Sequence, residues 1–179
     1  MLRPLALTLA LALVPAAAHA QQRHNTQAPI DFGADRIELQ DKANRAVLSG
    51  NVSVKQAEMT LDAARMTVAY TGRAIDGNPQ VSRLDASGGV TVTRPDQRAR
   101  AQYAIYDLNK RLITMLGAVS LTQGTNTVNG GRLVINLDTG RAAIDGSAVG
   151  GGTGGTPGAD GVVRSNGRVT GRFSVPDRK

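Results

Sequence analysis

The stretch Ala46–Val54, AVLSGNVSV, carries the pattern on which the fold assignment depends. Apolar side chains alternate with polar or small ones on both sides of Gly50, and a period of two indicates a strand with one buried face. The same Gly-x-Val element, or a close variant, returns at Gly89, Gly117 and Gly146, at steps of 39, 28 and 29 residues. Self-similarity at such a period is typical of stacked supersecondary units.

A second element also recurs, in which a small or acidic residue and a polar one precede an apolar-x-apolar pair. Its copies are Asp35–Leu39, Ala64–Val68, Ala101–Ile105 and Gly131–Ile135. We predict turns at 41–44, 108–110 and 138–140, where Asn, Asp, Lys or Gly residues gather. Each unit is then one strand, a turn, a second strand that ends at the glycine and a third strand after it. An all-β fold follows.

Two segments interrupt this pattern. Residues 55–66, KQAEMTLDAARM, are rich in helix formers, with Met59, Ala63 and Met66 on one helical face. The register match of Ala64–Val68 with the other units favours a strand, and both assignments stay open here. Thr71–Pro79 contains two glycines and a proline, and we expect a long exposed loop.

The chain ends differ in composition from the repeats. Residues 1–20 have a basic start, a short apolar run and Ala18-His19-Ala20, the pattern of a cleaved secretory signal peptide. The apolar run is about ten residues, whereas a membrane-spanning helix needs roughly twenty. We therefore predict a signal peptide at 1–20, a polar leader at 21–29, a β domain at 30–146 and a Gly-rich flexible tail at 147–179. One weak strand is expected near 169–175.

The composition argues against catalysis. The chain has no cysteine and two histidines, one in the signal and His24 in the leader, so Cys–His and Ser–His–Asp sites are not expected. Paired carboxylates remain a possibility, but most acids stand beside turn residues or arginine. No calcium-loop spacing is present, and no metal or cofactor is expected.

The net charge of +7 first suggests a nucleic-acid partner. A secreted chain rarely meets nucleic acid, and the basic residues of the repeats are spread singly. Either this is an ordinary surface with a modest excess of basic residues, or it attracts phosphate-bearing lipid headgroups.

The apolar face of the strands is the remaining candidate for a site. It could be the core of a closed sandwich or an open slot for acyl chains, because medium-sized aliphatic residues dominate and aromatics amount to 3%. Periodicity does not choose between a core and a slot.

Three segments then point to a known family. They are Ala28–Phe32 (APIDF), Ala34–Leu39 (ADRIEL) and Ala46–Val54, with a second copy of the strand–Gly–strand element at Arg111–Val119. The first three resemble the opening of the OstA-like periplasmic proteins, the LptA type, and Arg111–Val119 resembles the family's second copy of that element. The resemblance covers about residues 30–146. The resemblance implies an antiparallel β-jelly roll, open along one seam, that carries lipopolysaccharide (LPS) from the inner to the outer membrane.

The resemblance also implies partners and lining residues. The partners are LPS, an inner-membrane sibling (LptC-like) and the outer-membrane translocon (LptD-like), joined by β-edge pairing, with head-to-tail self-association possible and the ATPase in a separate membrane complex. Ile30 and Phe32 would line the slot near its N-terminal opening. The inward residues that would continue it are Ile37, Leu39, Leu48, Val52, Val54, Met66, Val68, Ile113, Met115, Val119 and Leu121.

Two alternatives remain. One is a periplasmic β-repeat adaptor with a closed core that binds only protein edges or cell-wall polymer. The other is a carbohydrate-active enzyme, which needs two carboxylates roughly 5–10 Å apart in a cleft.

Overall fold

The structure is a computed structural model that describes residues 24–72, 79–146 and 169–173. These residues form a single antiparallel sheet of ten strands, with one 3-10 turn (η1) and, among them, no helix that could cross a membrane. The elements in chain order are β1 (Ile30–Gly33), β2 (Arg36–Gln40), η1 (Asp41–Ala43), β3 (Arg45–Gln56), β4 (Met59–Thr71), β5 (Gln80–Arg94), β6 (Gln97–Asp107), β7 (Leu112–Gln123), β8 (Asn126–Asn136), β9 (Ala142–Asp145) and β10 (Thr170–Arg172).

The long strands bend near their middle. On β3 the pairing register shifts between Ser49 and Val52, and the two residues between them, Gly50 and Asn51, have φ of 75° and 44°. Gly88–Gly89 on β5 and Gly117–Ala118 on β7 repeat this pair of positive φ angles. Such a bulge bends a strand, and glycine or asparagine adopts positive φ at the least cost.

The glycine of the repeated element is therefore the corner of one continuous strand. The prediction that a strand ends at the glycine and another begins after it was wrong, because β3, β5 and β7 each run through their corner without a break. The copy at Gly146 follows β9, and its continuation lies outside the described residues.

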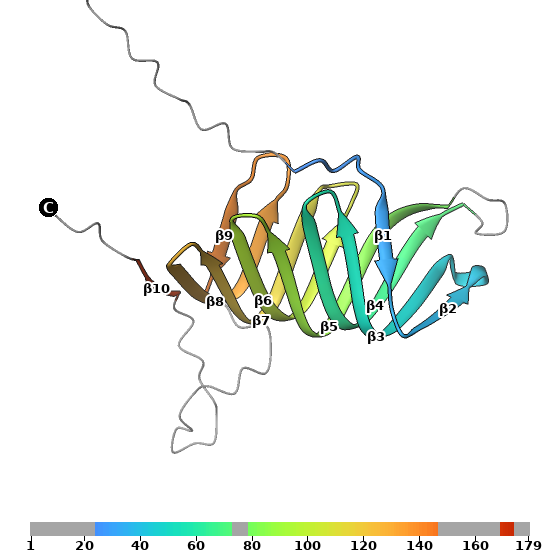
Figure 1. The fold of residues 1–179 in the computed structure, drawn as a ribbon, viewed down its shortest axis with the longest axis horizontal. Helices are drawn as coiled ribbons and strands as arrows, with labels where there is room; N and C mark the ends of the chain where they lie inside the picture. The colour runs from blue at the N-terminus through green and yellow to red at the C-terminus, as the bar shows by residue number, and fades with distance from the viewer. Residues whose placement is uncertain (1–23, 73–78, 147–168, 174–179) are drawn as a thin grey trace, which may run out of the picture.

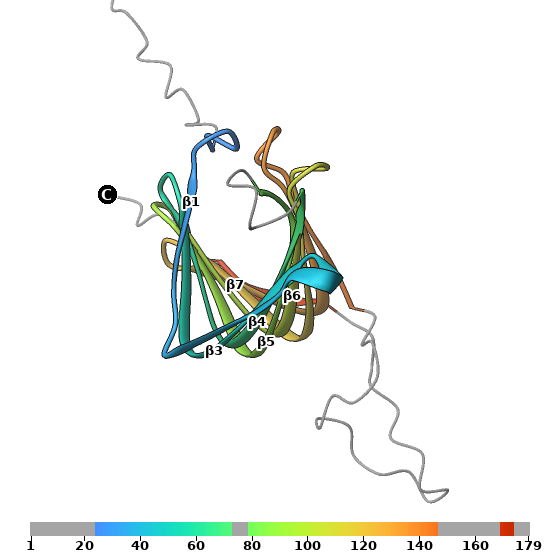
Figure 2. The ribbon, with the colours of Figure 1, turned by 90° about the vertical axis from the view of Figure 1, so that its right-hand side faces the viewer.

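The corners divide the sheet into two arms. The β1 arm contains β1, β10 and residues 52–63, 90–101 and 119–130. The β2 arm contains β2, β9 and residues 45–49, 65–72, 79–87, 103–116 and 132–136. Figure 2, which looks along the long axis of the molecule, shows the two arms as the sides of a U-shaped trough. This is the β-jelly roll, open along one seam, that the family resemblance implied.

Four short strands form the two ends of the sheet. β1 and β2 pair with the two halves of β3, and β10 and β9 pair with the two halves of β8 (Figure 1). β10 lies where a weak strand was expected, so the sheet extends beyond residue 146. Residues 55–66 belong to β3, β4 and the turn between them, which settles the choice between helix and strand in favour of strand.

The predicted turns fall where the chain reverses. Residues 41–43 form η1, Asn44 caps it in the left-handed conformation, and 108–111 and 137–139 are turns. Most of the predicted loop at 71–79 lies outside the described residues.

A candidate lipid-binding interior

The predicted lining residues of the long strands share the inner face of the trough. Their cross-strand partners show this, because Leu48 faces Met66 and Met115 faces Leu133. Both pairs belong to one apolar cluster that draws on both arms. Eight predicted lining residues are each at most 4% exposed: Leu48, Val52, Val54, Met66, Val68, Ile113, Met115 and Val119. In this state the side chains of the two arms fill the trough themselves.

The N-terminal end of the inner face is different. Ile37 and Leu39 on β2 pair with Leu48 and Ala46, and Phe32 on β1 pairs with Val54, so all three lie on the inner face. Their exposed fractions are nevertheless 46% for Ile37, 64% for Leu39 and 49% for Phe32, since no strand lies beyond them in the sheet. We call these three residues the mouth. Ile30, beside Gln56, is half-buried and packs against the core.

The C-terminal end also presents an aromatic side chain. Phe173, which follows β10, is 67% exposed, and its ring lies near Gly171, whose strand partner is Val128 on the inner face. Leu121, the last predicted lining residue, is half-buried opposite Val128. Phe173 was missed because the tail was taken as flexible, although Val169, Gly171 and Phe173 alternate with polar residues.

Sequence reasoning also missed a polar group inside the apolar interior. Gln56 is 2% exposed. Apart from the tyrosines, it is the one buried polar or charged side chain among the described residues. The Tyr106 hydroxyl donates a hydrogen bond of 2.7 Å to Gln56 Oε1, and the ring Nε2 of His24 lies 3.3 Å from the same oxygen. Nothing in the alternation of β3 distinguishes Gln56 except that it occupies a core position.

Burial shifts the pKa values of the two titratable side chains beside Gln56, which are Tyr106 and His24. It raises the pKa of Tyr106 to about 12, so the hydroxyl stays a donor at neutral pH. Burial also lowers the pKa of His24 below 6.5; Arg94 acts in the same direction, while the hydrogen bond to Gln56 and the charge of Glu58 oppose it. His24 is therefore neutral at neutral pH.

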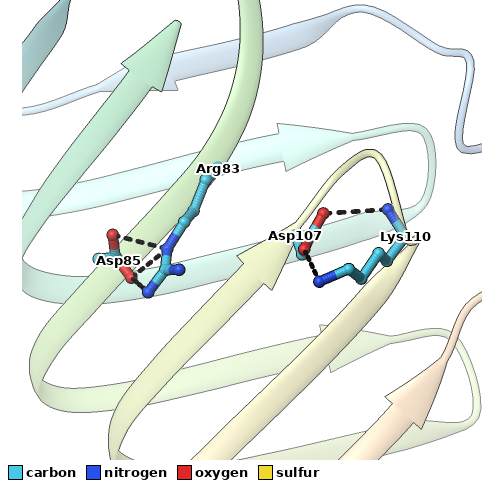
Figure 3. A network of polar contacts seen from close by, with 4 residues as sticks. All are labelled: Arg83, Asp85, Asp107 and Lys110. Atoms are coloured by element: carbon cyan, nitrogen blue, oxygen red, sulfur yellow. Dashed lines mark hydrogen bonds and ion pairs between the residues drawn. The ribbon is translucent and has the colours of Figure 1, made fainter.

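The acidic residues that the structure describes lie at or near the surface. None of the described Asp or Glu residues is buried. Figure 3 shows two of their arrangements at the surface: Arg83 forms an ion pair with Asp85 at 2.8 Å, and Asp107 accepts from the backbone N–H of Lys110 at 3.0 Å. That backbone hydrogen bond is the main cause that lowers the pKa of Asp107, the opposite of what a general acid requires.

Comparison with known proteins places the chain in a family. A family model described as "LptA/(LptD N-terminal domain) LPS transport protein" matches residues 32–141, more than half of the chain. The fold and the apolar trough thus define a protein of the bent-strand β-jelly roll class. The chain belongs to the LptA/(LptD N-terminal domain) family of LPS transport proteins.

Two individual matches accompany this one. A curated relative from Rhizobium meliloti (strain 1021), an uncharacterized protein, is 34% identical over 121 residues, and the match covers 65% of each of the two chains. The crystal structure of LptH from Pseudomonas aeruginosa, described as the LptA-homologous periplasmic component of the lipopolysaccharide transport device, superposes with a TM-score of 0.68. It is 18% identical, and the match covers 85% of this chain and 99% of that one, which supports the fold.

Proposed function

We propose that this protein is a periplasmic carrier that binds LPS by its acyl chains and passes it from the inner to the outer membrane. The observation that carries the proposal is the mouth, where Phe32, Ile37 and Leu39 extend the buried inner face into solvent. Soluble proteins rarely leave contiguous apolar surface exposed unless it binds something. The family and the fold support the same ligand.

The chemistry of the trough suits a lipid with a charged headgroup. Acyl chains would meet Leu39 and Ile37 first and then the inward residues of the long strands, from Leu48, Val52 and Val54 to Val119 and Leu121. The phosphorylated sugars would stay in water, near a surface with an excess of basic residues.

The ends of the sheet supply the partner surfaces. The outer edges of β1 and β2 at one end, and of β9 and β10 at the other, are the free edges of the described sheet. Another strand can pair there by β-augmentation. We propose an LptC-like sibling, an LptD-like translocon or a second copy of this chain as the partners at these edges.

The packed interior favours a second candidate, a closed-core adaptor that binds only other proteins or cell-wall polymer. The two candidates differ in whether the protein binds LPS at all, and the carrier also requires the mouth. In the carrier, Leu39→Asp lowers LPS affinity at least tenfold, because a carboxylate then stands where acyl chains enter.

The matched control is Val47→Asp, on the outer face of the neighbouring strand opposite Glu38. Both variants add one negative charge, so general repulsion of an anionic lipid is equal in the two. A parent protein that binds no LPS would support the adaptor. Retained LPS binding by Leu39→Asp, or an equal loss in Val47→Asp, would contradict acyl-chain entry at the mouth.

A further inference from the structure

Gln56 has every polar atom of its side chain engaged. Its Nε2 donates to the carbonyl oxygens of Thr26 at 3.0 Å and Ala28 at 3.1 Å, and its Oε1 accepts from Tyr106. A buried amide with both ends satisfied is a specific contact, because losing either partner leaves an unpaired polar group in an apolar interior.

The two side chains come from opposite arms of the trough. Gln56 lies beyond the corner of β3, in the β1 arm, whereas Tyr106 lies beyond the corner of β6, in the β2 arm. β3 and β6 are not neighbours in the sheet, since β4 and β5 stand between them. The hydrogen bond therefore crosses the seam and ties the two sides of the U together.

The chain that precedes β1 adds a third partner. Residues 24–29, which we call the strap, lie along the open side of the trough (Figures 1 and 2). Gln56 holds the strap through two backbone carbonyls, and His24 approaches its Oε1. Both carbonyls belong to the backbone, so this docking depends on Gln56 more than on the side chains of Thr26 and Ala28.

We propose that Gln56, Tyr106 and the strap form a latch that holds the trough shut and must open before an acyl chain can enter it. This latch rests on the proposed LPS function, and it adds what controls the entry of acyl chains into the trough. The inner side chains are at most 4% exposed at the eight lining positions of the long strands, so a lipid finds room only if the arms separate. Among the hydrogen bonds between side chains of the described residues, the Tyr106–Gln56 bond is the one that joins the two arms.

Two tyrosines make a matched pair for the test. Tyr106→Phe removes the hydroxyl that crosses the seam. Tyr70→Phe removes the hydroxyl of another buried tyrosine, whose hydrogen bond of 3.1 Å goes to Asp41 in its own arm. The two variants make the same chemical change and keep the ring, so each is expected to fold.

The first readout is the separation of the arms in the absence of lipid. The chain has no cysteine, so Asp96→Cys and Asn109→Cys place two unique spin labels at opposite ends of β6, one on each arm. We expect Tyr106→Phe to lengthen or broaden the distance distribution between the labels. Tyr70→Phe should give the same distribution as the labelled protein that keeps both tyrosines. Indistinguishable distributions in Tyr106→Phe and Tyr70→Phe would overturn the latch.

The second readout is the rate at which purified LPS associates. A latch predicts association several-fold faster in Tyr106→Phe than in Tyr70→Phe. If the parent protein binds no LPS while the label distances still respond to Tyr106→Phe, the carrier function fails and the bond across the seam stands. If LPS binds and both variants associate at the parent rate, the latch fails and the carrier function stands.

Discussion

Phe32 and Val54 face each other across the β1–β3 pair, yet Phe32 is 49% exposed and Val54 is 3% exposed. The two side chains lie on the same inner face, one at the end of the sheet and one inside it. The pair marks the boundary between the part of the interior that carries the fold and the part that is accessible to a ligand. Substitutions on the two sides of this boundary are expected to behave differently.

The buried side should respond in stability. Leu48→Ala removes a side chain that is 0% exposed, and we expect it to lower the free energy of unfolding by about 2–5 kcal/mol. Leu39→Ala, at the same face but 64% exposed, should change it by less than about 0.5 kcal/mol. Urea unfolding followed by circular dichroism measures both, and equal losses would contradict the boundary.

Gly50, in the corner of β3, should tolerate an added side chain less well than Gly89, in the corner of β5. Gly50 and Gly89 both have positive φ, but a Cβ on Gly50 would meet the Asp35 carboxylate, whereas a Cβ on Gly89 meets nothing within 4 Å. Gly89→Ala therefore carries only the backbone strain, on the order of 1–2 kcal/mol. Gly50→Ala must also displace Asp35, which accepts from Asn51 at 2.9 Å. The midpoint of thermal unfolding should be lower for Gly50→Ala than for Gly89→Ala. The reverse order would refute this account of the corner.

Tyr106 should be visible in an alkaline titration. Its pKa is raised to about 12, and burial also raises the pKa of Tyr70. Because the pKa of Tyr106 in the folded protein lies above the unfolded value of 10, its contribution to stability is complete below pH 10 and is lost as the pH rises toward 12. The tyrosinate absorbance should show a late phase that Tyr106→Phe removes, with Tyr70→Phe as the comparison. A late phase that persists in Tyr106→Phe would be inconsistent with this assignment.

His24 should make strap docking weaker in acid. Its pKa in the folded protein is below 6.5, so the unfolded chain takes up a proton first, and stability falls as the pH drops from 6.5 through the lowered value. Arg94 and Glu58 are the charged groups that act on it, in opposite directions. His24→Gln keeps a hydrogen-bonding side chain and does not titrate.

The measurement is the difference in unfolding free energy between the parent and His24→Gln, taken at about pH 7.5 and about pH 5.5. We expect the free energy of unfolding of the parent to fall at the lower pH relative to that of His24→Gln. A difference that does not change between the two pH values would show that His24 is not coupled to folding through the strap.

The alternation of Ala46–Val54 and its repeats was enough to predict the strands and their inner face, whereas the open seam came from the family resemblance. The role of Gly50 was not predictable in detail, because a glycine followed by Asn is compatible with a strand end as well as a bend. Residues 55–66 were ambiguous alone, since Met59, Ala63 and Met66 suit either a helix face or a bulged strand.

Contacts across the seam were beyond the reach of the sequence. Periodicity tells which face a side chain takes, but not what packs against that face. Gln56 and Tyr106 are 50 residues apart on strands that are not neighbours, so no local pattern links them. The choice between core and slot depends on the same missing information.

In the carrier, acyl chains of LPS enter at the mouth and contact the inner face. A photoreactive residue in place of Leu39, irradiated with LPS, tests it most directly, with the adjacent Glu38 on the outer face of β2 as the matched control. We predict a lipid adduct at position 39 and none at position 38. No adduct at Leu39, or adducts of equal yield at both positions, would contradict the claim.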